Sequence, residues 1–418
     1  MIPIKKHISE LRPSDTLTIN QLFLSRQEKG LETYRFGFGQ SPFPVPEIVQ
    51  EALRQNAYQK DYLPVNGLSD LRQAVADHTN DLLDGGFGAD EVFIGPGSKE
   101  LIYLIQMVLE GPLIIPSPSW VSYIPQALIS NKEIIQVNTP RETWNIEAKE
   151  LGKTLLNRGV RKGILLLNYP NNPTGRTYSD LELKSLAEVA RKHELLVISD
   201  EIYGLLNFSG EYRSIARYYP EATIITSGLS KWCGAGGWRL GTAIIPSNLS
   251  PLYNALCTTA SETFSAVSAP IQYAACVAFQ PSQEIDEYLQ ASIQILRRVS
   301  NYCHRILSLN EIPTLKSQGG FYLFPDLTKV LAHKYSNSSQ LCERILEETG
   351  VALLPGIAFG RPKSELTFRL SYVDFDGVKA LKHKDPDVEL RDTQFEELFP
   401  RIAKGMQSLV NWINRNRS

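Results

Sequence analysis

Residues 164–199 read ILLLNYPNNPTGRTYSDLELKSLAEVARKHELLVIS and contain a strand, a helix and a second strand in succession. The run ILLLN (164–168) is continuously apolar, which is typical of a strand buried on both faces of a parallel sheet. Residues 179–193 repeat their apolar side chains with the period of a helix, and Ser179 is a suitable N-cap. The run LLVIS (195–199) is the next strand, so the order predicts a right-handed crossover within a largely parallel sheet.

The same pattern continues on both sides of this unit. A buried helix is expected over residues 98–109. Further strands are expected at 91–95, 113–116, 133–138, 223–226 and 242–245. These elements predict an α/β large domain in which a mostly parallel sheet is flanked by helices.

The pattern changes from about residue 289. The elements expected there are helices at 288–309 and 339–348, the segment GGFYLF (319–324), and strands at 351–354 and 366–371. This order predicts a smaller α+β domain, to which the N-terminal segment also contributes. We therefore divide the chain into an N-terminal arm or small-domain segment (1–45), a large domain (46–288) and a small C-terminal domain (289–418).

Length and charge exclude several classes of protein. The 418 residues are enough for two domains or one large one, and 43% hydrophobic residues can form a sizeable core. The 43 Lys and Arg against 45 Asp and Glu give a net charge of −2, without the basic excess of nucleic-acid binders. The charged stretch 382–392 (KHKDPDVELRD) is expected to be a solvated loop rather than a binding patch.

Cysteine and apolar patterns indicate a cytoplasmic protein. The five cysteines are an odd number without CxxC spacing, which favours reduced thiols over disulfides or metal ligands. No HxxxH or HExxH pair supports a metal site. The N-terminus lacks the apolar run of a secretory signal, and no apolar stretch reaches the roughly 18 residues that a membrane span needs. We therefore expect no metal, membrane or nucleic-acid partner.

Five clusters combine residue types that bind small anionic ligands, and four of them follow predicted strands. Open α/β sheets collect ligands at the carboxyl ends of their parallel strands. The clusters are residues 95–99 (GPGSK), 169–175 (YPNNPTG), 199–203 (SDEIY), 227–239 (SGLSKWCGAGGWR) and 368–372 (FRLSY). Taken singly, each also has an ordinary explanation as a packing turn, a cap, a surface lysine or an internal ion pair.

The clusters supply complementary chemistry. A glycine turn that opens a helix, as at 95–99, can bind phosphate through free amides and the helix dipole. Asp200 is a buried carboxylate that needs a partner, and Tyr203 three residues later is expected to lie close to it. Lys231, among small residues and near Arg239, would have a lowered pKa and could act as an amine nucleophile. Arg369 in an apolar strand suits a bidentate carboxylate ligand.

Together these groups are the parts needed to hold pyridoxal 5′-phosphate (PLP) and an amino acid. The motifs YPNNPTG, SDEIYG, SKWCGAGGWRLG, GGFYLF and FRLSY resemble, in order and spacing, those of the class I/II aminotransferases, which are fold type I PLP enzymes. The resemblance runs from RPSDTLTIN (12–20) to FRLSY (368–372). It implies a transaminase that moves an amino group between an L-amino acid and a 2-oxo acid such as 2-oxoglutarate. It also implies PLP on the large domain and a homodimer with shared active sites.

The resemblance further implies a role for each matching residue. Lys231 resembles the Schiff-base lysine, Asp200 the partner of the pyridine nitrogen, and Arg369 the arginine that binds the substrate α-carboxylate. Asn172 and Tyr203 match the residues that hydrogen-bond the cofactor's phenolic oxygen; Tyr203 is counted as catalytic and Asn172 as also substrate-binding. Trp120 matches the aromatic residue that stacks on the cofactor ring, and Gly39 matches a glycine on the segment that covers the substrate. Tyr62 matches a tyrosine that the partner subunit contributes to the phosphate site. The residues that match the family's own phosphate-binding positions are Gly97, Ser98, Lys99 and Arg239.

Two positions depart from the family pattern, and one suggests a substrate. Gly228 stands where the family often has a phosphate-binding serine, so Ser227 or Ser230 is expected to replace that contact. Residues 39–46 (GQSPFPVP) lack the usual Pro-Asp pair. Arg12 lies in a segment that resembles bacterial-type aspartate aminotransferases. It is predicted to bind the distal carboxylate of a dicarboxylic substrate such as aspartate; a solvated arginine is the alternative.

Two other functions stay open at this point. A PLP-dependent lyase of the same fold, of the β-elimination or cyclopropane-forming type, shares every cofactor residue. A regulatory or binding module that kept the fold is the second alternative. Such a module usually lacks the lysine or the arginine, or adds a basic helix-turn-helix segment, and neither sign is present in this sequence.

Overall fold

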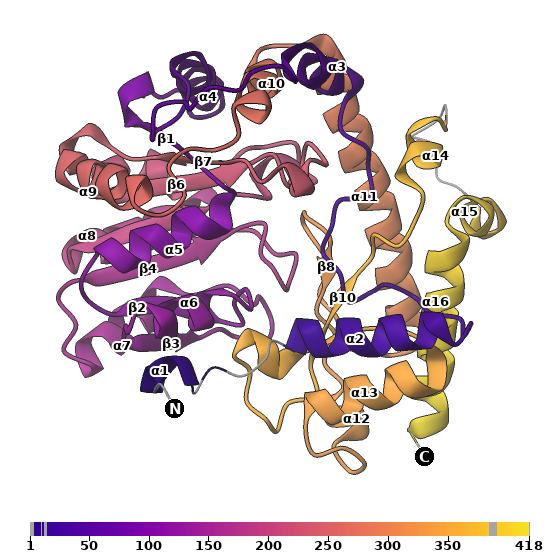
Figure 1. Cartoon of the computed structure of the whole chain (residues 1–418). Coiled ribbons are helices and arrows are strands. Elements are labelled where there is room, and N and C mark those ends of the chain that lie inside the picture. The colour runs from indigo at the N-terminus through magenta and orange to yellow at the C-terminus, as the bar shows by residue number, and fades with distance from the viewer. Residues whose placement is uncertain (1–3, 10, 12–14, 384–390, 418) are drawn as a thin grey trace.

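The computed structural model describes residues 4–9, 11, 15–383 and 391–417. One half of the molecule is built on a seven-stranded sheet and the other half on a three-stranded sheet (Figure 1). The large sheet has the order β1-β7-β6-β5-β4-β2-β3. Its strands are β1 (Val92–Gly95), β2 (Leu113–Ser117), β3 (Ile134–Asn138), β4 (Gly163–Asn168), β5 (Leu195–Asp200), β6 (Thr223–Gly228) and β7 (Gly241–Ile244). The predicted α/β class is confirmed, and each predicted strand of this half is present.

Only β7 runs against the other strands of the large sheet. The neighbouring pairs from β3 to β6 are parallel, whereas β7 is antiparallel to both β6 and β1. Residues 229–240 connect β6 to β7 and bring Gly241 back opposite Gly228. Because this connection stays at one edge of the sheet without a crossover, the returning strand has to run antiparallel.

Both faces of the large sheet are covered by helices, as the apolar run at 164–168 predicts. Leu165 and Leu167 of β4 pack with helices α7 (Ala148–Asn157) and α8 (Asp180–Lys192). Ile164 and Leu166 point the other way, into the core formed with helices α5, α6 and α9. Their bounds are α5 (Ser98–Val108), α6 (Tyr123–Ile129) and α9 (Ser250–Ser261). The strand is therefore buried on two sides, which is why its sequence does not alternate.

Helix α8 begins where its sequence predicts. The Ser179 side chain accepts a hydrogen bond from the Glu182 amide at 3.3 Å, and the Glu182 carboxylate accepts one from the Ser179 amide at 2.7 Å. This reciprocal pair satisfies two amides that the first turn of a helix leaves free.

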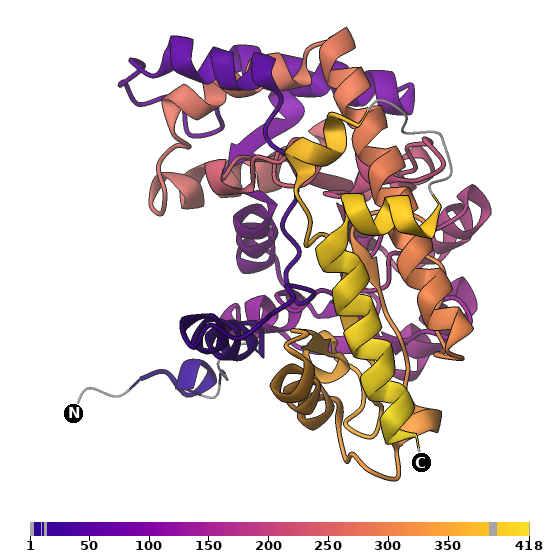
Figure 2. The same cartoon turned by 90° about the vertical axis from the view of Figure 1, so that its right-hand side faces the viewer.

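The other half is built on the sheet β8-β10-β9, formed by Tyr322–Leu323, Phe368–Ser371 and Leu354–Pro355. The strand predicted at 351–354 is shorter: Val351 forms a single bridge, to Tyr34 of the N-terminal segment, and the ladder begins only at Leu354. Helix α16 (Pro400–Asn416) was not predicted. It runs along the outside of this half (Figure 2). It buries Ile402, Met406, Leu409, Trp412 and Ile413.

The remaining helices complete the two halves. They are α1 (Lys6–Ser9), α2 (Asp15–Glu28), α3 (Glu47–Asn56), α4 (Ser69–Leu83), α10 (Ala269–Phe279), α11 (Gln283–Leu309), α12 (Thr328–Leu331), α13 (Ser338–Thr349), α14 (Gly377–Leu381) and α15 (Asp392–Leu398). The domain division at 45/46 and 288/289 stays a prediction, and its second boundary lies inside α11. Within the described ranges, no helix has both the length and the apolar character to cross a membrane.

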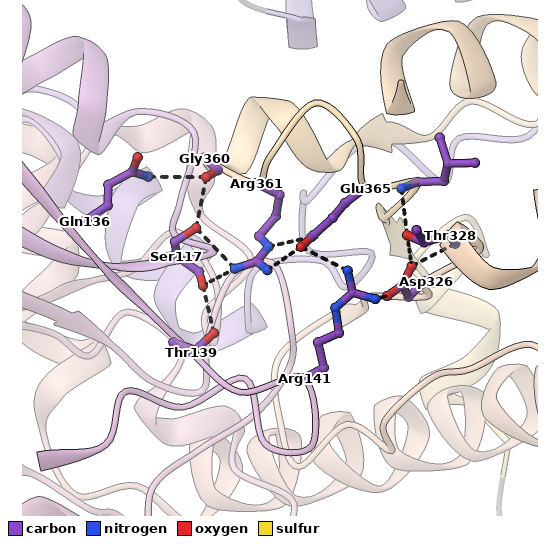
Figure 3. A network of polar contacts seen from close by, with 10 residues as sticks. Ser117, Gln136, Thr139, Arg141, Asp326, Thr328, Gly360, Arg361 and Glu365 are labelled. Atoms are coloured by element: carbon purple, nitrogen blue, oxygen red, sulfur yellow. Dashed lines mark hydrogen bonds and ion pairs between the residues drawn. The ribbon is translucent and has the colours of Figure 1, made fainter. Parts of the chain in front are cut away.

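Arg361, which is 8% exposed, joins the two halves of the molecule (Figure 3). Its Nε and Nη2 atoms donate to the two carboxylate oxygens of Glu365, each at 2.8 Å. Its Nη1 atom donates at 2.7 Å to the carbonyl oxygen of Ser117, at the end of β2. Arg141 pairs with Glu365 at 3.0 Å and with Asp326. The buried charges of this network therefore compensate one another.

Glu365→Ala is expected to lower the free energy of unfolding by about 3–5 kcal/mol, because Arg361 would remain buried without its partner. Asp90→Ala is the control. Asp90 pairs with Arg72 at 3.3 Å but is fully exposed, so its loss should leave the urea midpoint unchanged. Unfolding in urea, followed by circular dichroism, measures both variants.

The pH dependence of this effect follows from the carboxyl group. Burial raises the pKa of Glu365, but hydrogen bonds from Arg361 and Arg141 outweigh burial, so the pKa is lowered in the folded protein. The stabilisation is then complete above the ordinary pKa of a glutamate and is lost as the pH falls through the lowered value. A difference between wild type and Glu365→Ala that stays constant into strong acid would contradict this account.

Candidate functional site

A cavity of about 610 Å³ opens at the edge of the large sheet where β4, β5 and β6 end. An adjoining cavity of about 740 Å³ shares part of its wall and reaches the small half. Arg369 lines the second cavity. The first cavity is lined by Gly39, Gln40, Ser98, Lys99, Trp120, Asn168, Asn172, Asp200, Ile202, Tyr203, Ser230, Lys231, Gly236, Gly237 and Arg239. The structure thus brings all five sequence clusters together. Four of them follow strands that end at this edge, and Arg369 of β10 reaches the adjoining cavity from the small half.

Asp200 ends β5 and is 3% exposed. Its Oδ2 atom accepts a hydrogen bond from the hydroxyl of Tyr123 at 2.6 Å. Burial raises the pKa of Asp200 to about 6, although the Tyr123 hydrogen bond and the positive charge of Lys231 lower it. Tyr203 lies close to Asp200, as predicted: both line the first cavity, and burial together with the charge of the carboxylate raises the pKa of the Tyr203 hydroxyl. The chain turns after β5, so the Tyr203 hydroxyl meets Tyr322 at 2.6 Å.

The amine of Lys231 contacts the N-terminal segment at Gly39. Its Nζ atom donates to the carbonyl oxygen of Gly39 at 2.6 Å. Burial, together with the nearby charge of Arg369, lowers the pKa of Lys231 to about 8. The sequence predicted Arg239 as the neighbouring cation; Arg239 also contributes, but less than burial and Arg369. An amine with this pKa is partly neutral near neutral pH and can act as a nucleophile or a proton acceptor.

One end of the first cavity is suited to an anion. A Cβ at Gly97, where φ is +92°, would come within 2.2 Å of Arg239 Nη2. A Cβ at Gly241 would come within 2.3 Å of the backbone nitrogen of Ser98, the first residue of α5. The two glycines therefore let a guanidinium and the amides at the start of a helix gather at one point. Such an arrangement binds phosphate groups.

The structure separates the two serines that were expected to compensate for Gly228. Gly228 has a φ of +150°, and a Cβ there would come within 2.5 Å of the carbonyl oxygen of Leu240. A serine at this position would therefore collide with the start of β7. Ser230 lines the first cavity, whereas Ser227 lines a separate small cavity beside Trp232. Ser230 is thus the serine in position to contact an anion.

Arg369 is 4% exposed. Among the residues that the structure describes, no carboxylate forms an ion pair with it. Its Nη1 atom donates to Asn172 Oδ1 at 2.9 Å and its Nη2 atom to the carbonyl oxygen of Gly37 at 2.7 Å. Its Nε atom is buried without a partner. A buried guanidinium costs free energy unless its donors are satisfied, so this arrangement suits a carboxylate ligand.

The other predicted residues of this site also line the cavities. Trp120 lies between them, with its ring 5.1 Å from Lys99 Nζ, and burial lowers the pKa of that lysine. Asn172 is 4% exposed, and its backbone N–H donates to Asn168 Oδ1 at 2.8 Å. Tyr203 is 2% exposed, with Lys231 Nζ 5.5 Å from its ring centre.

Two predicted residues are not brought to the site. Tyr62 is 94% exposed and lines neither cavity of this chain. Arg12 lies outside the described residues.

Sequence reasoning missed several polar residues that contact the site. Tyr123 reaches Asp200 from α6, and Tyr322 reaches Tyr203 from β8. Glu201, 1% exposed, follows Asp200 and accepts hydrogen bonds from four hydroxyls: those of Ser199, Tyr212 and Ser214 at 2.5–2.6 Å, and that of Tyr169 at 3.1 Å. The position of Tyr322 in GGFYLF was a usable signal, whereas nothing in the local sequence marks Tyr123.

Known proteins with similar sequences and folds are transaminases by name. The chain is 30% identical over 381 residues to an aspartate aminotransferase of Bacillus sp. (strain YM-2), which covers 88% of this chain and 94% of the relative. It is 28% identical to an asparagine–oxo-acid transaminase of Streptococcus mutans over 89% of this chain and 95% of that protein. The structure of an aspartate aminotransferase from Thermus thermophilus with maleate matches with a TM-score of 0.84 and 25% identity, covering 98% of this chain and 100% of that one.

A family-level comparison covers most of the chain. Residues 30–381 match the family described as "Aminotransferase class I and II". This range contains all five clusters and both cavities' lining residues. The chain therefore belongs to the class I and II aminotransferases.

Proposed function

We propose that this aminotransferase moves the amino group of a dicarboxylic L-amino acid to a 2-oxo acid such as 2-oxoglutarate. The observation that carries the proposal is the buried guanidinium of Arg369, which lies near Lys231 and pairs with no carboxylate in the described ranges. A substrate α-carboxylate would supply the missing anion. The names of the relatives favour a transaminase over a lyase, which the motifs alone left open.

The cofactor of this family is PLP, and the residues of the first cavity fit it. The Gly97–Ser98 turn, Ser230 and Arg239 would hold the phosphate at one end, and Asp200 the ring nitrogen at the other. When bound, PLP supplies an aldehyde that takes up amino groups and a ring that withdraws electrons. The raised pKa of Asp200, about 6, reflects burial without a full cationic partner, and a protonated ring nitrogen would stabilise its ionised form.

The chain's own residues would divide the remaining work. Lys231 would be the point of covalent attachment and, once released, would carry the proton between the substrate carbon and the cofactor. Its lowered pKa, about 8, suits an amine that has to accept and return a proton. Arg369 would hold the substrate carboxylate, and Gly39 and Gly37 would close the cavity from the N-terminal segment.

We also propose a cytoplasmic homodimer in which Tyr62 completes the phosphate site of the partner subunit. The exposed aromatic side chains of Tyr58 and Tyr62, 75% and 94% exposed, support an interface at this segment. The family resemblance assigns the same segment to the dimer contact.

The dicarboxylic substrate is supported by two observations. The name of the Thermus thermophilus structure includes maleate, a dicarboxylate. Lys99 lines both cavities and adds a cation near Arg369. Arg12 is proposed as the residue that binds the distal carboxylate. An aromatic or neutral donor is the competing candidate, because Phe38, Tyr103 and Ile129 give the second cavity an apolar wall.

Lys231→Ala is expected to lower kcat by about 10²–10⁴-fold, the usual contribution of a positioned acid–base group. Purified wild type should be yellow, and borohydride treatment should attach the cofactor to the peptide that contains Lys231, as found by mass spectrometry. A variant that transaminates at the wild-type rate, or a label on another lysine, would contradict the assignment.

Mixing Tyr62→Phe subunits with Lys231→Ala subunits is expected to restore part of the activity that each variant lacks. A hybrid dimer would hold one site in which both residues are native. Activity is measured after mixing, and native mass spectrometry verifies that hybrids have formed. Verified hybrids with no recovery would count against shared sites.

Arg12→Ala is expected to reduce kcat/KM for aspartate by about 10-fold or more and to leave phenylalanine and alanine nearly unchanged. Only the dicarboxylate would lose a charge-assisted hydrogen bond. Steady-state kinetics with the three amino donors measures the effect. Equal losses for all three donors, or none, would show that Arg12 does not bind the substrate side chain.

A further inference from the structure

Tyr322 of β8 lies between the residues that would bind the substrate and those that would bind the cofactor. It is 1% exposed, and its hydroxyl is 2.6 Å from the hydroxyl of Tyr203 and 3.5 Å from Asn172 Nδ2. Its ring centre lies 4.6 Å from the guanidinium carbon of Arg369. A Cβ at Gly39 would come within 1.9 Å of the Tyr322 hydroxyl, so this glycine leaves the space that the hydroxyl occupies.

The hydrogen bonds around Tyr322 have a defined direction. A guanidinium can only donate, so Asn172 has to turn its oxygen toward Arg369 and its NH₂ group toward Tyr322. The Tyr322 hydroxyl then accepts from Asn172, and its own proton is available for Tyr203. In this direction the chain of donors runs from Arg369 through Asn172 and Tyr322 to Tyr203. The proton of Tyr203 remains free to point into the first cavity.

The opposite direction changes which proton lacks an acceptor. Among the contacts that the structure describes, the unpartnered proton is that of Tyr203 in the first direction and that of Tyr322 in the opposite one. Only Tyr203 lines the first cavity, where a bound ligand could accept the proton. In the opposite direction the Tyr203 proton would be turned away from the cavity. Buried hydroxyls normally satisfy their donors, and hydrogen bonds in a chain polarise one another when they share a direction. The cationic end at Arg369 therefore favours the direction toward Tyr203.

We propose that Tyr322 is a positioning residue that turns the Tyr203 proton into the cavity, toward the cofactor's phenolic oxygen, and links it to the carboxylate-binding Arg369. The inference rests on the proposed function, since it takes PLP as the occupant of the first cavity. Tyr322 thereby couples the two binding regions: a carboxylate on Arg369 would neutralise the cation at which the donor chain begins.

Tyr322→Phe tests the proposal, because it removes the hydroxyl and keeps the ring beside Arg369. The expected result is an upward shift of about half to one pH unit in the midpoint of the bound cofactor's visible absorption. A weaker donor stabilises the anionic phenolic oxygen less, which favours protonation of the chromophore. The value of kcat should also fall about 3- to 10-fold, with a smaller change in KM. The other ionisable groups around Tyr203 are unaltered in this variant: Asp200, Lys231, Arg369, Arg239, Lys99 and Tyr123.

The matched control is Tyr372→Phe. Tyr372 is fully buried, and its hydroxyl donates to the Gly320 carbonyl oxygen at 3.0 Å. This control should leave the absorption midpoint unchanged. Tyr203→Phe should shift the midpoint as well, and adding Tyr322→Phe to it should produce no further shift, because Tyr322 acts through Tyr203.

Three outcomes would overturn the proposal. These are an unchanged midpoint in Tyr322→Phe, an equal shift in Tyr372→Phe, and a full additional shift in the double variant. Each of them leaves the proposed function standing, provided that the wild type binds PLP and transaminates. A wild type that shows no visible absorption with PLP would instead refute the proposed function itself.

Discussion

The guanidinium of Arg369 is the group around which three distant parts of the chain meet. It donates to the Gly37 carbonyl oxygen of the N-terminal segment and to Asn172 beyond β4, and it lies 5.2 Å from the ring centre of Phe359 in the small half. A buried cation is costly unless its surroundings supply acceptors and polarisable rings. The N-terminal segment, the edge of the large sheet and the small half therefore have to converge on one point, and that point is the wall of the cavity.

Burial at this point has opposite effects on the acid and the amine of the site. It raises the pKa of Asp200 to about 6 and lowers that of Lys231 to about 8. Both shifts have the same cause, since a low-dielectric environment disfavours whichever form is charged. The charged groups thus lack full compensation within the chain, which is typical of residues that await a charged ligand. By contrast, Arg361 and Glu365 compensate each other and serve to hold the two halves together.

The large sheet was predictable because its signal is local. A strand buried on both faces has an unbroken apolar run, as at 164–168, and a helix that follows it shows its cap at Ser179. The direction of β7 was harder to predict from the sequence, because it depends on the path of residues 229–240 rather than on the sequence of the strand itself. Helix α16 carries a readable apolar period, but its position against the small half depends on contacts with distant elements.

The sequence by itself determined which residue types could do the chemistry: Lys231, Asp200, Arg369 and Asn172 stand in short motifs that resemble those of the class I/II aminotransferases. Only the tertiary structure decided how they are partnered. Tyr123 meets Asp200 across 77 positions of the chain, and Tyr322 meets Tyr203 across 119. The separation of Ser230 and Ser227 into different cavities, and the leading role of burial and Arg369 in the Lys231 pKa, are likewise absent from any local pattern. Partners and desolvation arise from contacts between segments far apart in sequence, so they exist only once the chain has folded.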